Sequence, residues 1–171
     1  MAGTVISSHK LFGAPALIRS LGDKPNSLID GVQIGVITYS FRDMPDQSAE
    51  ATLHYVLDSG ISAIELMGGP AESFAGAPKN SVNMQTFFPL MRKRRENQAL
   101  TEDEQKQLTE AEAQMKAYRT EVAKWRLSAP MNKFEQVRKM YNQAGVKIYG
   151  FKPDTFGMQS SDAEIEYGLR A

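Results

Sequence analysis

Three segments of the chain are apolar and rich in β-branched residues, and a glycine precedes each of them. They cover residues 32–41, 61–67 and 146–151. The first segment runs for ten residues without a charge. This composition is typical of a strand buried on both faces, as in a parallel sheet. We therefore predict a strand in each segment.

Apolar residues at helical spacing separate these strands. Asp46 or Ser48 can cap a first helix, which Gly60 ends in the manner of a glycine just beyond a helix terminus. A second helix is predicted at residues 132–144, and Ser161 with Glu164 forms a capping box that opens a third near the end of the sequence. The two helix–glycine–strand junctions resemble each other and form a weak internal repeat.

A long insertion at about residues 71–128 lies between the second and third strands. Residues 71–83 are rich in glycine, proline, alanine and serine and are predicted to be a loop. A capping box of Thr101 and Glu104 then opens a charged helix with one apolar stripe, formed by Leu108, Ala111, Met115, Tyr118, Val122 and Trp125. The stripe predicts a helix packed onto its own domain, with a partner-binding helix as the alternative. The basic cluster at residues 92–95 is interpreted as a solvated surface rather than a phosphate site.

Alternating strands and helices with buried parallel strands predict an α/β fold. The first strand ends in Tyr39-Ser-Phe-Arg42, without the glycine-rich loop of a dinucleotide fold or of a P-loop. The favoured architecture is therefore a (β/α) barrel, whose chemistry takes place at the carboxyl ends of its strands.

Composition narrows the function classes. The 171 residues carry 20 Lys and Arg against 20 Asp and Glu, so a neutral net charge gives no electrostatic argument for a nucleic-acid or anionic-membrane partner. No apolar run is long enough to span a bilayer. The absence of cysteine excludes disulfides, thiol nucleophiles and iron–sulfur sites. Residues 1–30 are interpreted as an extension or leader rather than an intact signal peptide, which leaves a soluble cytoplasmic or periplasmic location open.

Three motifs resemble the sugar phosphate isomerase/epimerase family, the xylose isomerase-like TIM barrels. They are GVQIGVITYSF at residues 31–41, SGISAIELMG at 59–68 and VKIYGFKPD at 146–154. The resemblance covers about residues 31–67 and 128–171, in the order of the family. It implies that residues 31–171 form the N-terminal part of such a barrel, with about three of its eight β/α units and the helical insertion.

The resemblance also implies an activity and a cofactor. Proteins of this family move a proton next to a carbonyl with the help of a divalent metal, expected to be Mn, Mg or Co. The metal ligands of the family lie mostly on later strands, and His9 and His54 do not show ligand spacing in this sequence. We therefore assign no metal ligand to this chain.

Polar residues at the strand ends are the candidate pocket residues. Tyr39 and Arg42 end the first strand, and Arg42 can hold a sugar hydroxyl or a phosphate, or pair with Asp43 or Asp46. Further candidates, each expected to line the pocket or to be a structural charge, are Glu65 in the second strand, and Lys152 and Asp154 after the third.

Three functions remain open. The first is a sugar or sugar phosphate isomerase/epimerase, and the second is a lyase on 3-keto-glycosides, which needs the same proton abstraction beside a carbonyl. The third is a non-catalytic fragment or interaction module. Three parallel strands leave two sheet edges unpaired, so we expect a homo-oligomer or a second chain that completes the barrel.

Overall fold

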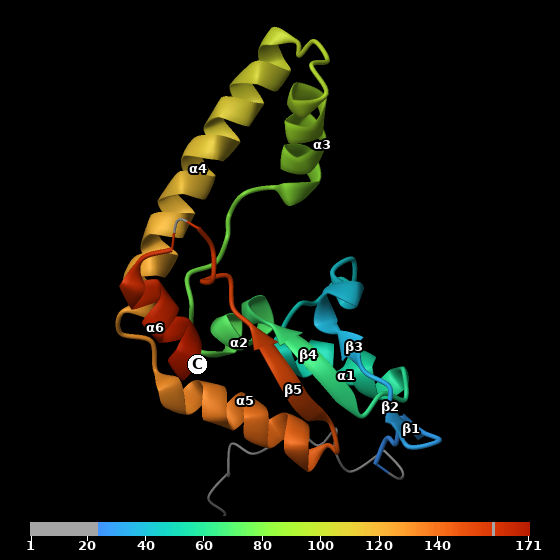
Figure 1. Cartoon of the computed structure of the whole chain (residues 1–171). Coiled ribbons are helices and arrows are strands. Elements are labelled where there is room, and N and C mark those ends of the chain that lie inside the picture. The colour runs from blue at the N-terminus through green and yellow to red at the C-terminus, as the bar shows by residue number, and fades with distance from the viewer. Residues whose placement is uncertain (1–23, 159) are drawn as a thin grey trace, which may run out of the picture.

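The computed structural model describes residues 24–158 and 160–171, and it is a mixed α/β structure (Figure 1). The elements in chain order are β1 (Leu28–Ile29), β2 (Val32–Gln33), β3 (Val36–Ile37), the 3₁₀ helix Thr38–Phe41, α1 (Ala49–Asp58), β4 (Ala63–Met67), α2 (Gly68–Phe74), α3 (Met84–Arg95), α4 (Glu102–Arg126), α5 (Met131–Gln143), β5 (Lys147–Lys152) and α6 (Asp162–Arg170). The predicted α/β class is confirmed.

A small parallel sheet has the order β3-β4-β5, with β4 in the centre. Val36 lies opposite Ile64 on one side of β4, and Ile64 lies opposite Ile148 on the other. The register shifts after this pair, so that Glu65 lies opposite Gly150. Because of this bulge, both Ile148 and Phe151 point to the face that Ile64 and Leu66 also line, where they join the core.

The core lies between this face of the sheet and the helices. Its buried members come from α1, β4, α2, α5 and α6, from the residues that cap the ends of α2 and α5, and from the residue just before β5: Ala49, Leu53, Val56, Ile64, Leu66, Ala71, Ala75, Phe134, Val137, Tyr141, Ala144, Val146 and Tyr167. The helical spacing of apolar residues therefore predicted α1 and α5 correctly, because the apolar faces of both helices pack into this core. Gly60 and Gly145 follow their ends at φ values of 68° and 86°, a conformation that favours glycine.

The prediction of one strand over residues 32–41 is wrong. Asp30 and Gly31, both at positive φ, turn the chain so that β2 pairs antiparallel with β1 in a short hairpin. Only Val36–Ile37 joins the parallel sheet, and a 3₁₀ helix follows at once. Burial on both faces is also wrong, because Val32 is 61% exposed. Hairpin strands and buried strands are both rich in β-branched residues, so the composition of this segment does not distinguish between them.

The prediction of a loop over residues 71–83 is wrong at its start. Helix α2 begins at Gly68, directly after β4, and continues to Phe74. Pro70 is tolerated because it lies in the first turn, where a backbone N–H has no partner within the helix. Helix α3 was not predicted, and its cap is the Asn83 side chain, which accepts bonds from the N–H groups of Gln85 and Thr86.

Helices α3 and α4 form a hairpin that projects from the α/β body (Figure 1). The predicted capping box at Thr101 opens α4, and Leu108, Met115 and Val122 of its stripe are buried. Leu90 of α3 is buried as well. The stripe thus packs on its own chain, as predicted. Of the described helices, none combines the length and the apolar character that a membrane span requires.

Candidate functional site

The carboxyl ends of the three parallel strands are held together by a hydrogen bond and a close backbone contact. The Met67 N–H at the end of β4 donates to Thr38 Oγ1, just beyond β3, over 2.9 Å. Gly68 brings the start of α2 against the segment after β5, since a Cβ on Gly68 would lie 2.9 Å from Pro153 Cα. The ends of the three strands therefore lie side by side at one end of the sheet.

A cleft of about 840 Å³ opens at this end of the sheet, beside β3 and β4. Its walls are the 3₁₀ helix and the turn after it, the start of α2, residues 77–80 and the middle of α4. Polar and aromatic side chains line it, among them Tyr39, Arg42, Lys79, Asn80, Tyr118 and the acidic residues Asp46 and Glu72. A cleft of this size with a few polar groups suits a small molecule.

Tyr39 and Arg42 form one unit on the cleft wall. The Arg42 guanidinium lies over the Tyr39 ring, 4.8 Å from its centroid, and donates to the Tyr39 carbonyl over 3.3 Å. Arg42 also lies 3.6 Å from the Asp43 carboxylate, an exposed pair that is worth little. Of its two expected partners, Asp46 instead accepts from the Ser48 N–H. The Arg42 side chain is half exposed, so it retains donors for a ligand.

The remaining candidates lie outside this cleft. Glu65 lies on the sheet face opposite the core, where its Cγ would be 3.4 Å from a Cβ on Gly150. Lys152 is exposed at the end of β5, opposite Met67. Asp154 is exposed, and its carbonyl oxygen accepts a bond from Arg126 over 3.3 Å. The structure therefore brings together only Tyr39 and Arg42 of the five predicted residues.

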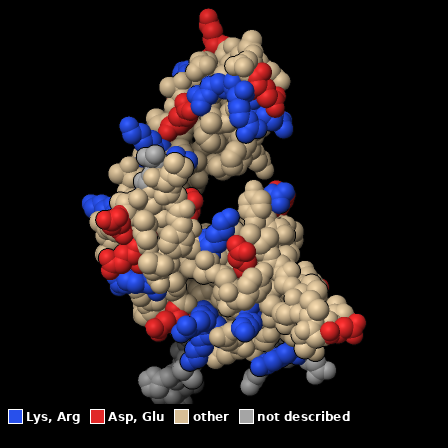
Figure 2. Space-filling view, viewed as in Figure 1, with Lys and Arg blue, Asp and Glu red and all other residues tan. Residues whose placement is uncertain are grey.

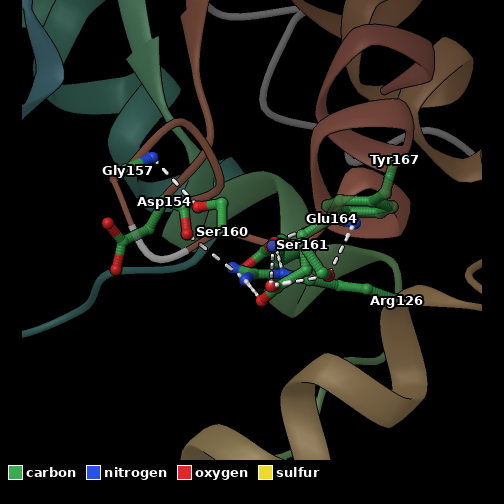
Figure 3. A network of polar contacts seen from close by, with 8 residues as sticks. Arg126, Asp154, Gly157, Ser160, Ser161, Glu164 and Tyr167 are labelled. Carbon is green, nitrogen blue, oxygen red and sulfur yellow. Dashed lines mark hydrogen bonds and ion pairs between the residues drawn. The ribbon is translucent and has the colours of Figure 1, made fainter.

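A buried polar network beside the cleft was missed by the sequence analysis. Arg126 of α4 donates from Nε to Glu72 Oε1 over 2.9 Å and from Nη2 to Glu72 Oε2 over 3.2 Å, and both side chains are about a tenth exposed. The Tyr167 hydroxyl donates to the same Oε1 over 2.9 Å. Figure 3 shows Arg126 beside Tyr167 and Glu164, and the Arg126 guanidinium also lies 3.9 Å from Glu164 Oε1 and donates to the Asp154 carbonyl. Helices α2, α4 and α6 thus meet at one carboxylate.

Burial and the Glu72 charge keep two phenols near this network protonated. Burial raises the pKa of Tyr167, and the charge of Glu72 and its hydrogen bond raise it further. Burial also raises the pKa of Tyr118 in the cleft, with Glu72 adding to the effect. Both phenols are therefore protonated at physiological pH, and Tyr167 uses its proton in the bond to Glu72. The sequence held no local signal for this network, because Glu72 and Arg126 are 54 residues apart.

The described residues do not fit a metal site. Over residues 24–158 and 160–171, no three His, Cys, Asp or Glu side chains are grouped so that they could hold an ion. His54 lies within α1 and is half-buried, whereas His9 lies outside the described residues. We therefore derive no chemical step through a metal from these residues.

We compared the chain with protein-family models, with curated proteins and with solved structures, and no match was found. The resemblance to the sugar phosphate isomerase/epimerase family stays a prediction from sequence.

Proposed function

We propose that this protein acts on a sugar or sugar phosphate, as an isomerase- or epimerase-like protein, and that β3, β4 and β5 are N-terminal strands of a xylose isomerase-like barrel. The observation that supports this proposal is the cleft at the carboxyl ends of β3 and β4, with Tyr39 and Arg42 on its wall. Barrels of parallel strands bind their ligands at this end.

The side chains of the cleft suit a hydroxyl-rich ligand with an anionic group. Arg42 offers a planar set of donors that can bind a phosphate at two points. The Tyr39 ring, 56% exposed, offers an aromatic face for the C–H side of a sugar ring. Tyr118 supplies a protonated phenol from the opposite wall. These residues bind and orient a substrate, and that is the role we propose for them.

The family's reaction is a proton transfer next to a carbonyl, assisted by a divalent metal. The described side chains do not supply a donor set for that ion. The proposal for this chain is accordingly limited to substrate binding at the cleft.

Calorimetric titration of the full chain with three probes tests the proposal: a ketose phosphate, the same ketose without phosphate, and a 3-keto-glycoside. We expect the phosphorylated ketose to bind best, and Arg42→Ala to weaken it by about tenfold or more, because a charge-assisted contact is lost. Arg170→Ala is the matched control, since Arg170 is 60% exposed and also has a long ion pair. Equal binding by both variants, or no binding of any probe, would contradict the proposal. Preference for the keto-glycoside would favour the lyase.

A further inference from the structure

The two outer edges of the parallel sheet are unpaired within the described part of the chain. β3 and β5 each have β4 as their only described neighbour in the sheet. Unpaired edges present free N–H and C=O groups that can pair with another strand. Because β3 and β5 run parallel, the β5 edge of one molecule and the β3 edge of another can be adjacent strands of one parallel sheet.

The core reaches the surface beside β5. A hollow of about 220 Å³ lies between this strand and α5, with apolar walls that include Leu66, Phe134, Val137, Ile148 and Phe151. A hollow of this size next to an unpaired strand can take an apolar side chain from an added strand. Tyr149, in the middle of β5, is 57% exposed on the other face of the sheet.

The two segments that contain these edge strands carry opposite net charge. Residues 28–60, which include β3 and α1, contain five acidic residues and one arginine, which gives a net charge of −4. Residues 131–152, which are α5 and β5, contain five basic residues and one glutamate, which gives +4. Figure 2 shows Lys and Arg side chains gathered over α5, at the bottom of the view. The whole chain is neutral, so positive and negative charge are separated between these two segments.

The charges also correspond along the strand direction. Lys152 ends β5 and Asp43 follows the 3₁₀ helix after β3, so both lie toward the carboxyl ends of the strands. Lys147 begins β5 and Asp58 is the last residue of α1, which returns the chain to the opposite end. Parallel pairing of β5 with the β3 of a second copy would place Lys152 at the same end of the sheet as Asp43 of that copy. It would place Lys147 at the same end as Asp58. Such complementarity accelerates association and fixes register.

We infer that the β5–α5 edge of one copy docks on the β3–α1 edge of a second copy of this chain. The second copy adds parallel strands to the sheet and closes the hollow beside β5. Two copies related by a two-fold axis along the strands use both edges of each, so the pair closes and no edge remains. This inference is independent of the sugar chemistry, because it rests on strand polarity, the hollow and charge.

Sedimentation velocity of the full chain tests the inference. We expect a species of twice 19.0 kDa at low ionic strength that dissociates as NaCl is added. Lys147→Glu/Lys152→Glu removes the net positive charge of residues 131–152 and leaves glutamates facing Asp43 and Asp58 of the second copy. Asp43→Lys/Asp58→Lys removes the net negative charge of residues 28–60 and leaves lysines facing Lys147 and Lys152. Each double variant alone is expected to raise the dissociation constant by about tenfold or more, and an equimolar mixture of the two is expected to restore the dimer as a heterodimer.

Matched controls carry the same charge changes on the exposed surface of α4. Lys116→Glu/Lys124→Glu and Glu110→Lys/Glu121→Lys are expected to leave the dimer intact. Circular dichroism establishes that each variant is folded. Hydrogen exchange of the wild-type chain gives a second readout, in which the amides of residues 147–152 become protected as concentration rises. A wild-type monomer, or a dimer that both edge reversals leave intact, would overturn the inference.

Discussion

Arg126 and Glu72 form a buried two-point ion pair, with Nε 2.9 Å from Oε1 and Nη2 3.2 Å from Oε2. The pair joins the last turn of α4 to α2, immediately beyond the central strand. The third bond to Glu72 comes from Tyr167 of α6. Because both charges are largely withdrawn from water, each depends on the other to balance its charge.

Arg126→Met should therefore destabilise the protein by about 3–5 kcal/mol, since it leaves the Glu72 carboxylate buried without its cation. Urea unfolding followed by circular dichroism measures the change. Arg170→Met, on the exposed surface of α6, is the control and should cost less than about 1 kcal/mol. The double variant Glu72→Met/Arg126→Met should recover much of the loss, because it removes both charges. An Arg126 variant as stable as the control would show that the pair does not hold the helices.

Local signals in the sequence were enough for much of the fold. The caps at Ser48, Thr101 and Ser161 all accept bonds from the first turns of their helices, as their residue types predicted. The strands β4 and β5 and the helix stripes were also predicted correctly. These features depend on residues within one or two turns of each other, where spacing and residue type determine the conformation.

Features that depend on distant residues were missed. Nothing near Glu72 indicates that Arg126 will bind it, and the glycines around α2 hid a helix that starts at the end of a strand. The same limit applies to the candidate site. Arg42 reaches Tyr39 because a 3₁₀ helix replaces the expected strand, and Lys152 and Asp154 lie outside the cleft because β5 is not beside β3.

The two adjacent glycines at the start of α2, Gly68 and Gly69, differ in the space available for a side chain. A Cβ on Gly68 would lie 2.9 Å from Pro153 Cα and 3.4 Å from the Lys152 carbonyl oxygen, whereas a Cβ on Gly69 would meet no atom within 4 Å. Gly68→Ala should cost about 1–3 kcal/mol, because the segment after β5 must move away from α2. Gly69→Ala should be neutral or stabilise by up to about 1 kcal/mol, because alanine favours the helix.

Thermal and urea unfolding of both variants measures the difference. The two substitutions add the same methyl group one residue apart, so composition and general helix propensity are matched. Similar stabilities for the two variants would mean that the backbone contact at Gly68 does not constrain the strand ends.

The capping box that opens α4 predicts a local effect. Thr101 Oγ1 accepts from the Glu104 N–H over 3.2 Å, and Glu104 accepts from the Thr101 N–H over 3.1 Å. Thr101→Ala should cost about 1 kcal/mol and loosen the first turns of α4. Hydrogen exchange should then show faster exchange near residue 104, with β4 unchanged. Thr120→Ala is the control, because this threonine lies within the helix and its hydroxyl bonds only the Lys116 carbonyl among described groups. Faster exchange throughout the protein would contradict a local role.

Two buried tyrosines should make the protein sensitive to alkali. Burial raises the pKa of Tyr141, and the charge of Glu50 adds to the effect. Burial also raises the pKa of Tyr167, where the charge of Glu72 adds to it. In the unfolded chain both phenols lose their protons near pH 10, at the ordinary value. Above that pH the folded state holds more protons than the unfolded state, so the free energy of unfolding falls as pH rises. The expected slope is about 1.4 kcal/mol per pH unit for each tyrosine.

Urea unfolding at a series of pH values from about 8 to 11 measures this slope. Stability that these groups contribute should be fully present below about pH 10 and should decline above it. Tyr141→Phe and Tyr167→Phe should each remove part of the decline while lowering stability at neutral pH, because the bonds to the Ala49 carbonyl and to Glu72 are lost. If the double variant kept the full slope of the wild type, other groups would have to be responsible for the alkaline loss, and the two phenols would not be held protonated by the fold.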